Sequence, residues 1–232
     1  MIKLKKNIIP TIISLSSILS GFIAIIMASY DEIQFSAMMI LLGAFFDGID
    51  GKIARALKAS DEMGKEMDSL ADLATFGLAP GYLLYQASLY KLGNWGILVS
   101  ALIPIFAALR LARFNLKPTK NYFEGVPSTW AGISIAILLG FYHQIFNTYF
   151  YLFYAIIISL LMVSSFRYYK PNKEFLLLNP RKILVYILIL GSFIINYRLF
   201  LLVLIFWYNI SGIIFFIFRI RPKKIKSYKI NY

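Results

Sequence analysis

Long apolar stretches recur along the whole chain and are separated by short polar segments. Most of them approach the roughly 20 residues that a helix needs to cross the hydrocarbon core of a bilayer. The pattern predicts membrane-spanning helices at residues 8–29, 34–57, 67–90, 95–114, 128–146, 149–166, 182–197 and 199–219. We therefore expect an all-α fold, a polytopic bundle of about eight transmembrane helices.

The composition supports a membrane protein and excludes ordinary soluble domains. Of the 232 residues, 59% are hydrophobic and only 15% are charged, which is typical of a polytopic membrane protein. The formal net charge is +13, but the lysines and arginines flank apolar runs and form no separate basic patch. We therefore expect the anionic surface of membrane lipids to be the partner of these charges, and we expect no nucleic acid.

The basic residues are distributed unevenly between the two ends of the predicted helices. Of the 24 lysines and arginines, all but Lys91 and Arg198 fall on the side that carries both termini. Cytoplasmic loops of membrane proteins carry this excess of positive charge. The sequence therefore predicts a multi-pass protein of the cell membrane with both termini, and the polar segment at residues 46–75, facing the cytoplasm.

Four aspartates interrupt the apolar pattern in that polar segment. They are Asp47, Asp50, Asp68 and Asp72. An ionisable side chain in a membrane segment costs several kcal/mol unless it is paired, bound to a metal or facing a wet cavity. The two pairs are separated by three and by four residues, so each pair shares one face of a helix. Converging carboxylate oxygens favour a hard divalent ion such as Mg²⁺ or Mn²⁺.

Other residues of the segment suit a phosphorylated substrate. Gly51 and Gly64 carry no Cβ, which lets a ligand approach the backbone closely. Arg55 lies eight residues after Asp47 and returns to roughly the same helix face, where its guanidinium could contact a phosphate. Acids, glycines and an arginine in this arrangement indicate a metal ion that holds a phosphate-bearing substrate.

The complete pattern resembles the signature of a known family. It reads Asp47-x2-Asp50-Gly51-x2-Ala54-Arg55-x8-Gly64-x3-Asp68-x3-Asp72, and it is similar to the signature of the CDP-alcohol phosphotransferases. The resemblance implies one or two divalent ions bound by Asp47, Asp50 and Asp68. It implies that Asp72 is the catalytic base and, where two ions bind, a further ligand. It also implies that the CDP-lipid contacts Thr11, Asp50, Gly51, Ala54, Arg55 and Gly64.

Three further segments are similar to the members of this family that use serine as the acceptor. Residues 63–80 (MGKEMDSLADLATFGLAP) resemble their pattern GKELDSLADxxSFGxAP, with Thr75 in place of the usual serine. Residues 110–115 read RLARFN, as in these family members. Residues 123–128 (FEGVPS) resemble their pattern FxGLPS, with Val126 in place of leucine. The resemblance extends over about residues 7–131, and beyond that point only the membrane pattern supports it.

The same segments supply candidate ligands for serine. Arg110 and Arg113 share one helix face at the predicted cytoplasmic end, and a guanidinium suits the carboxylate of an amino acid. The alternative is that both are ordinary basic residues flanking a transmembrane helix. Further candidates for contact with the serine hydroxyl or amine are Asn115, Thr75 and Ser128.

These patterns predict an enzyme that transfers the phosphatidyl group of a CDP-lipid to the hydroxyl of L-serine and releases CMP. Asp72 would accept the hydroxyl proton while the serine oxygen attacks the phosphorus that carries the lipid. The tails could be those of diacylglycerol or of archaeol. Residues 1–146 would form the catalytic core, and residues 147–232 would add the last three helices and a basic tail. The resemblance also implies a homodimer.

Three alternatives remain open at this point. Another member of the family could use a different acceptor, such as glycerol phosphate or inositol phosphate. A divalent-cation transporter would also need carboxylates within the membrane, but on a path that is open to both sides. The four aspartates instead lie at one end of the predicted helices. A purely structural membrane protein would leave the signature unexplained.

The charge asymmetry gives a testable topology. Because the chain contains no cysteine, Ser60→Cys and Lys120→Cys should be shielded from a membrane-impermeant thiol reagent in intact cells. Glu32→Cys and Asn94→Cys should react under the same conditions. The yield of labelling before and after permeabilisation measures the difference. Labelling of Ser60→Cys from outside intact cells would overturn the predicted orientation.

Overall fold

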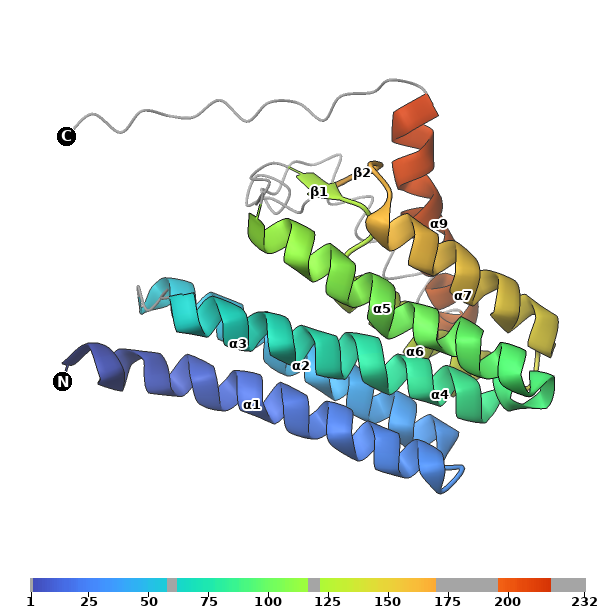
Figure 1. Ribbon diagram of the computed structural model, residues 1–232, viewed down its shortest axis with the longest axis horizontal. Helices are drawn as coiled ribbons and strands as arrows, with labels where there is room; N and C mark the ends of the chain where they lie inside the picture. Colours follow the sequence, from blue (N-terminus) through green and yellow to red (C-terminus); the bar gives the residue numbers. More distant parts are fainter. Residues whose placement is uncertain (1, 58–61, 117–121, 170–195, 218–232) are drawn as a thin grey trace.

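A computed structural model describes residues 2–57, 62–116, 122–169 and 196–217 (Figure 1). Within these ranges the chain is almost entirely helical, with two short strands. The elements are α1 (Ile2–Ser29), α2 (Ile33–Ala56), α3 (Glu62–Leu73), η1 (Ala74–Leu78), α4 (Ala79–Ala87), η2 (Leu89–Leu92), α5 (Asn94–Leu116), β1 (Tyr122–Glu124), α6 (Ser128–Tyr142), α7 (Thr148–Val163), β2 (Arg167–Tyr169) and α9 (Tyr197–Ile217).

The prediction of a helical membrane protein agrees with this architecture. Four helical segments in the described ranges are long and apolar enough to cross a membrane: Pro10–Ser29, Ile33–Ala54, Asn94–Leu116 and Tyr197–Ile214. Helices α6 and α7 are also apolar but shorter, with 15 and 16 residues. The predicted span at residues 182–197 lies, except for its last two residues, outside the described part of the chain.

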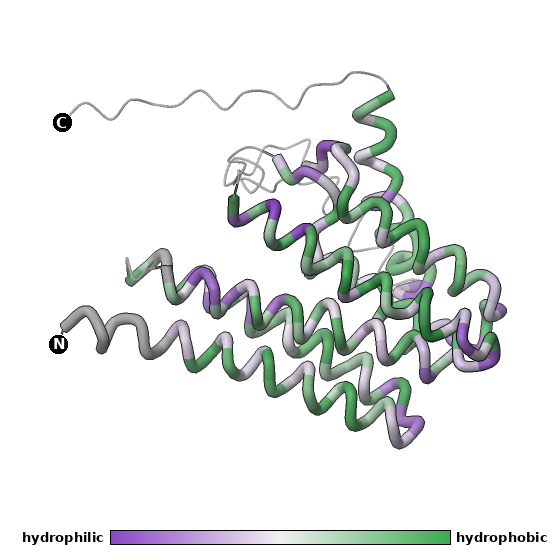
Figure 2. The backbone as a smooth tube through the Cα atoms, in the orientation of Figure 1, coloured by the Kyte–Doolittle hydropathy of each residue, from purple (hydrophilic) through white to green (hydrophobic). Residues whose placement is uncertain are grey.

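The apolar residues and the charges are arranged as a membrane protein requires. Hydrophilic residues gather toward the two ends of the helices, and apolar residues occupy the lengths between them (Figure 2). Many large apolar side chains on α1, α5 and α7 are exposed, for example Leu19, Leu109 and Phe153. These side chains suit contact with lipid tails, which are as apolar as the side chains themselves.

The helix predicted at residues 67–90 departs from its expected form. It begins earlier, at Glu62, and its middle turn is the π-helix η1. Pro80 lies at the start of α4 and has no N–H to donate to the carbonyl four residues before it. The chain continues through a wider turn, in which the N–H of Ala79 donates to the carbonyl of Ala74. The sequence pattern missed this turn because proline alone does not determine how a helix accommodates it.

Helix α1 packs against α2, α3, η1 and α4 through a stripe of small residues. The buried members of this stripe are Ser14, Ser17, Ser20, Gly21, Ala24 and Ala28. Small side chains let two membrane helices approach closely and replace the hydrophobic driving force that lipid surroundings do not supply. The stripe therefore determines which face of α1 meets the site-bearing helices.

Thr75 is the point at which η1 is fixed to this stripe. Its side chain is fully buried, and its hydroxyl donates to the carbonyl of Ser17 over 2.9 Å. A Cβ at Gly43 would overlap the Thr75 methyl group, and one at Gly21 would lie 2.9 Å from the Thr75 Cα. Both glycines are needed because the π-turn comes so close to α1 and α2. Thr75 therefore has a packing role in this fold.

The later helices form a second packed group. The strands β1 and β2 pair antiparallel, with Phe123 opposite Tyr168. Asn209 of α9 accepts a hydrogen bond from the Trp130 indole on α6 and donates to the Tyr154 hydroxyl on α7, each over 3.2 Å. The Tyr168 hydroxyl donates to the backbone carbonyl of Asn209. These bonds hold α6, α7, α9 and β2 together around the buried Asn209.

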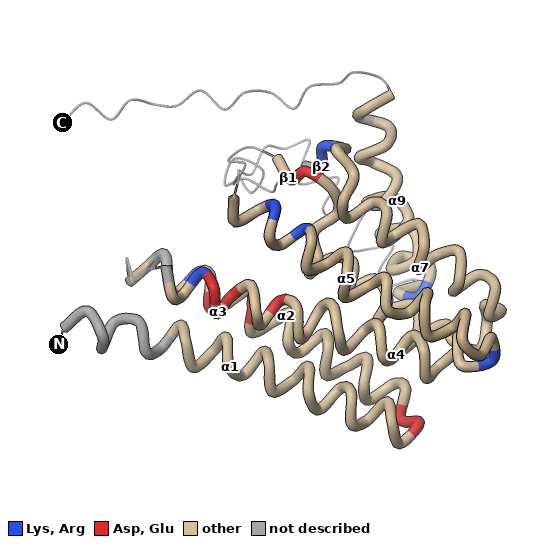
Figure 3. The backbone as a smooth tube through the Cα atoms, viewed as in Figure 1, with Lys and Arg blue, Asp and Glu red and all other residues tan. Residues whose placement is uncertain are grey.

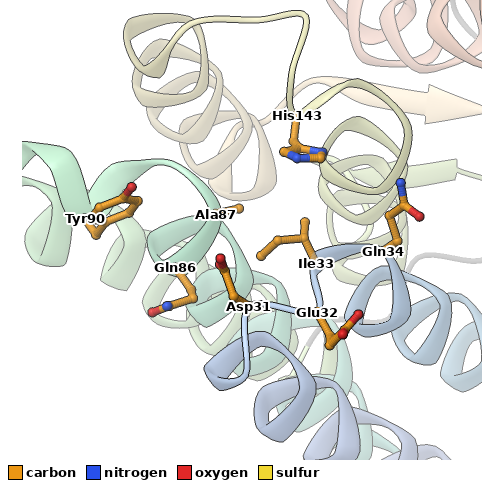
Figure 4. A pocket seen from close by; sticks show the side chains of 8 residues that line it. All are labelled: Asp31, Glu32, Ile33, Gln34, Gln86, Ala87, Tyr90 and His143. Carbon is orange, nitrogen blue, oxygen red and sulfur yellow. The ribbon is translucent and has the colours of Figure 1, made fainter.

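The two ends of the bundle differ in charge. The aspartates of α2 and α3 and the arginines near the end of α5 lie toward one end, whereas the α1–α2 turn with its acidic residues lies toward the other (Figure 3). That second end contains a pocket of about 310 Å³ (Figure 4). It is lined by Asp31, Glu32, Ile33, Gln34, Gln86, Ala87, Tyr90 and His143. Asp47 lies 14 residues beyond Ile33, about 21 Å along α2, so the pocket is separate from the aspartate site.

The packing around Thr75 predicts the effect of a single methyl group. Gly43→Ala should lower the apparent melting temperature of the detergent-solubilised protein, because overpacking of this kind costs about 1–3 kcal/mol. Gly48→Ala is the matched control on the same helix, since its Cβ would meet no atom within 4 Å. Alanine favours a helix over glycine by about 1 kcal/mol, so the control should be neutral or stabilising. Equal melting temperatures for the two variants would contradict the tight contact.

Candidate active site

The aspartates that the sequence singled out come together at one end of the bundle. Asp47 and Asp50 lie near the end of α2, and Asp68 lies on α3. One carboxylate oxygen from each of the three lies within 4.8 Å of the other two. Oxygen ligands sit about 2.1 Å from Mg²⁺, so the oxygens around one ion are about 3–4 Å apart. The three carboxylates therefore fit a divalent ion with small adjustments.

Asp72 extends this cluster by one helical turn. Its carboxyl group lies close enough to those of Asp47 and Asp68 for the charges to repel one another. Its Oδ2 receives a long hydrogen bond of 3.4 Å from the Ser128 hydroxyl. Its Oδ1 is buried and has no hydrogen-bond partner among the described residues. A buried carboxylate oxygen without a partner indicates a missing donor or cation.

Arg110 stands behind Asp72. Its guanidinium donates through Nη1 to the Ser128 hydroxyl over 2.8 Å, and the residue is only 6% exposed. The buried Nε of Arg110 has no hydrogen-bond partner within the described ranges. A chain of three side chains therefore runs from Arg110 through Ser128 to Asp72, and among the described residues the Nε of Arg110 and the Oδ1 of Asp72 at its two ends have no hydrogen-bond partner.

Arg113 has a different environment from Arg110. Its Nη1 donates to the carbonyl of Val163 over 2.7 Å. Its Nη2 donates to the carbonyls of Glu124 and Ser164, over 2.9 and 3.2 Å. These carbonyls belong to β1 and to the end of α7, where the helix leaves carbonyls without partners. The guanidinium of Arg113 therefore connects two segments of backbone, β1 and the end of α7, to α5.

The remaining predicted serine ligands also differ in position. The Asn115 amide donates to the Ser69 hydroxyl on α3 over 3.0 Å, at an exposed position. Ser69 directly follows Asp68, so Asn115 lies at the border of the cluster. Thr75, in contrast, points its hydroxyl at α1. Of the predicted serine ligands, Arg110 and Ser128 are the ones in the hydrogen-bonded chain that ends at Asp72.

The predicted nucleotide-binding residues lie on the helices around the cluster. A Cβ at Gly51 would meet no atom within 4 Å, so there is open space beside this part of α2. Ala54, Gly64 and Thr11 are half-buried on α2, α3 and α1. Arg55 belongs to α2, but its side chain lies outside the described part of the structure. The open space at Gly51 suits the approach of a ligand to the backbone.

The sequence did not single out Ser14, which contacts the cluster directly. Its hydroxyl donates to Oδ2 of Asp50 over 2.6 Å. Ser14 lies three residues after Thr11 and therefore on a similar face of α1. That spacing was the available signal, but α1 carries several serines, and only its packing against α2 selects Ser14.

The chain belongs to the CDP-alcohol phosphatidyltransferase family, whose sequence model matches residues 7–218. This confirms the resemblance recognised in residues 47–72, and it defines the chain as an enzyme that transfers substituted phosphate groups. The match also continues beyond residue 131, where the sequence motifs end, as far as the end of α9.

Several curated relatives are named for the transfer of a lipid phosphate group to serine. The chain is 40% identical over 140 residues to a CDP-diacylglycerol–serine O-phosphatidyltransferase of Bacillus subtilis, which covers 60% of this chain and 79% of the relative. It is 36% identical over 221 residues to a protein of the same name from Methanocaldococcus jannaschii, covering 94% and 98%. It is 35% identical over 166 residues to an archaetidylserine synthase of Methanothermobacter thermautotrophicus, covering 69% of each.

The contacts of Arg113 predict a structural role. Arg113→Ala leaves three carbonyls without a charged donor, and hydrogen bonds to charged groups contribute about 1.5–3 kcal/mol. The variant should therefore melt at a lower temperature. The molecules that remain folded should bind both substrates with almost unchanged affinity. Thermal unfolding followed by tryptophan fluorescence, together with KM values, measures both effects. A variant of normal stability but with a raised KM for the acceptor would instead place Arg113 in the substrate site.

Proposed function

We propose that the enzyme transfers the phosphatidyl group of a CDP-lipid to the hydroxyl of L-serine and releases CMP. The observation that carries the proposal is the chain from Arg110 through Ser128 to Asp72. Arg110 and Ser128 come from the two segments that resemble the serine-using members of the family, and Asp72 comes from the signature common to all members. The names of the relatives support the same acceptor and both kinds of lipid, with diacylglycerol or archaeol tails.

The metal centre in this proposal consists of Asp47, Asp50 and Asp68, with Asp72 beside it as a shared ligand where two ions bind. The carboxylate oxygens of the first three are close enough to hold one ion, and hard oxygen ligands favour Mg²⁺ or Mn²⁺. A bound ion supplies positive charge that neutralises the pyrophosphate and the departing CMP.

Asp72 is the base of the proposed reaction. Its Oδ1, which has no partner among the described residues, accepts the proton of the serine hydroxyl. The serine oxygen forms a bond to the lipid-bearing phosphorus, and the bond from that phosphorus to the CMP oxygen breaks. CMP leaves with the electron pair. Positioning of the two substrates and stabilisation of charge account for the acceleration.

Arg110 has two tasks in this scheme. Through the Ser128 hydroxyl it holds Oδ2 of Asp72, so that Oδ1 stays directed to the acceptor. Its free Nε–H is available to the carboxylate of serine, for which a charged donor is the strongest hydrogen-bonding partner. The acceptor is thereby recognised by the same group that orients the base.

The CDP-lipid occupies the other side of the cluster. Gly51 and Gly64 leave room for the nucleotide, Thr11 and Ala54 border it, and Arg55 contacts the phosphates. The lipid tails extend into the bilayer, while serine and CMP exchange with the cytoplasm, an orientation that the excess of basic residues at this end supports. The division into a catalytic core at residues 1–146 and a second part at residues 147–232, and the homodimer that the resemblance implies, belong to the same proposal.

The identity of the acceptor is tested by varying the acceptor alcohol and by substituting Arg110. In a CMP-release assay with a CDP-lipid, the enzyme should use L-serine, and addition of EDTA should abolish the activity until Mg²⁺ or Mn²⁺ is restored. Arg110→Ala should lower kcat/KM for serine about ten- to more than a hundredfold, which corresponds to about 1.5–3 kcal/mol. Arg110→Lys should recover only part of this loss, because lysine lacks the planar fork.

One result would contradict the proposed acceptor, and another would contradict the proposed contact between Arg110 and serine. Equal turnover of serine and ethanolamine would show that the carboxylate is not recognised, and the acceptor would then be another alcohol. An unchanged KM for serine in Arg110→Ala, with only kcat reduced, would limit Arg110 to the orientation of Asp72. Glycerol phosphate and inositol phosphate complete the acceptor panel, since they are the substrates of the family alternative.

A further inference from the structure

We propose that Ser14 of α1 is a positioning residue of the metal centre. Its hydroxyl orients Asp50, so α1 contributes to metal binding indirectly. The inference rests on the proposed function, because it assumes that Asp50 is a metal ligand. Ser14 itself donates to Asp50 and supplies no ligand. Its effect is to hold the Asp50 carboxylate in the orientation in which the three aspartates converge.

The contact between the two side chains is short and buried. The Ser14 hydroxyl lies 2.6 Å from Oδ2 of Asp50, and the residues are 6% and 4% exposed. The hydroxyl also lies 3.2 Å from the carbonyl of Pro10. A hydroxyl has one proton to donate, and a carboxylate accepts a shorter and stronger bond than a carbonyl. The proton of Ser14 is therefore directed to Asp50.

Asp50 needs such a donor because of its neighbours. One of its carboxylate oxygens lies within 4.8 Å of a carboxylate oxygen of Asp47 and of Asp68. Like charges at this distance repel one another strongly in a medium of low dielectric constant. Without a donor, rotation of the Asp50 side chain away from the other two would relieve the repulsion. A hydrogen bond to Oδ2 opposes this rotation and leaves the other oxygen available to a cation.

Helix α1 is itself fixed close to this contact. Ser17, one turn further along, donates to the carbonyl of Gly43 on α2 over 3.2 Å. Gly43 and Asp50 are seven residues apart, about two turns of α2. Two hydroxyls on one face of α1 therefore bind α2 at two levels, one through its backbone and one through the carboxylate. Partners that orient the ligands of a metal in this way typically contribute about 10–100-fold to its affinity.

Binding of Mn²⁺ to the purified full-length protein tests the inference without relying on activity. Titration followed by electron paramagnetic resonance gives the Kd, and the rise in melting temperature with Mn²⁺ gives an independent measure. Ser14→Ala should raise the Kd for Mn²⁺ about 10–100-fold, and Ser14→Gly, which removes the same hydroxyl, should do the same. Ser14→Thr keeps the hydroxyl and should restore most of the affinity.

Ser20→Ala is the matched control. Ser20 lies on the same stripe of α1 and is also buried, but its hydroxyl donates to the carbonyl of Ser16 within the helix. This variant should bind Mn²⁺ with the affinity of the unmodified protein. A normal Kd for Ser14→Ala, or equal losses in Ser14→Ala and Ser20→Ala, would overturn the role of Ser14 while leaving the metal centre intact.

A different result would remove the metal centre itself. Asp50→Asn should abolish the binding of Mn²⁺, because it removes the charge of a proposed ligand. If the unmodified protein did not bind Mn²⁺, or if Asp50→Asn bound it as tightly, the proposed centre would fail and the role of Ser14 with it. The two failures are therefore distinguishable in a single set of titrations.

Discussion

The repulsion between four carboxylates at the end of an apolar bundle is the constraint around which this structure is built. Three of their oxygens lie within 4.8 Å of one another, a spacing that is costly unless donors or a cation offset it. The surrounding contacts are donors to these groups: Ser14 to Asp50 and Ser128 to Asp72. The hydroxyls offset part of the repulsion, and the remainder favours the binding of a divalent ion.

The rotation of α3 about its axis determines whether Asp68 and Asp72 face α2. Thr75 follows Asp72 by three residues, so the two lie on neighbouring positions of one face. Because Thr75 is enclosed by Gly21, Gly43 and the backbone of Ser17, α3 cannot rotate without breaking this packing. The π-turn therefore affects the site indirectly. It packs Thr75 against Gly21 and Gly43, and this packing fixes the direction in which Asp68 and Asp72 point.

The sequence predicted those parts of the site that depend on local spacing. Apolar length predicted the helices, and separations of three and four residues predicted that the aspartates share faces. The two arginines of α5 show where this reasoning ends. They are three residues apart, which leaves about 60° between them around the helix. That difference directs Arg110 to Ser128, and Arg113 to the carbonyl of Glu124 and to two carbonyls about 50 residues further along the chain. Only the tertiary fold determines such partners, and the same holds for Ser14.

The first turn of α6 connects the site to the C-terminal helix. Ser128 is the first residue of α6, where the unpaired N–H groups and the helix dipole favour a nearby negative charge such as that of Asp72. Trp130, two residues on, packs against Tyr208 with ring centres 4.5 Å apart and the rings tilted by 46°, and its indole donates to Asn209. Through these contacts α9 holds the turn that presents Ser128 to Asp72. The part of the chain without recognisable motifs therefore supports the position of the proposed base, which gives a physical reason for the family match to continue through α9.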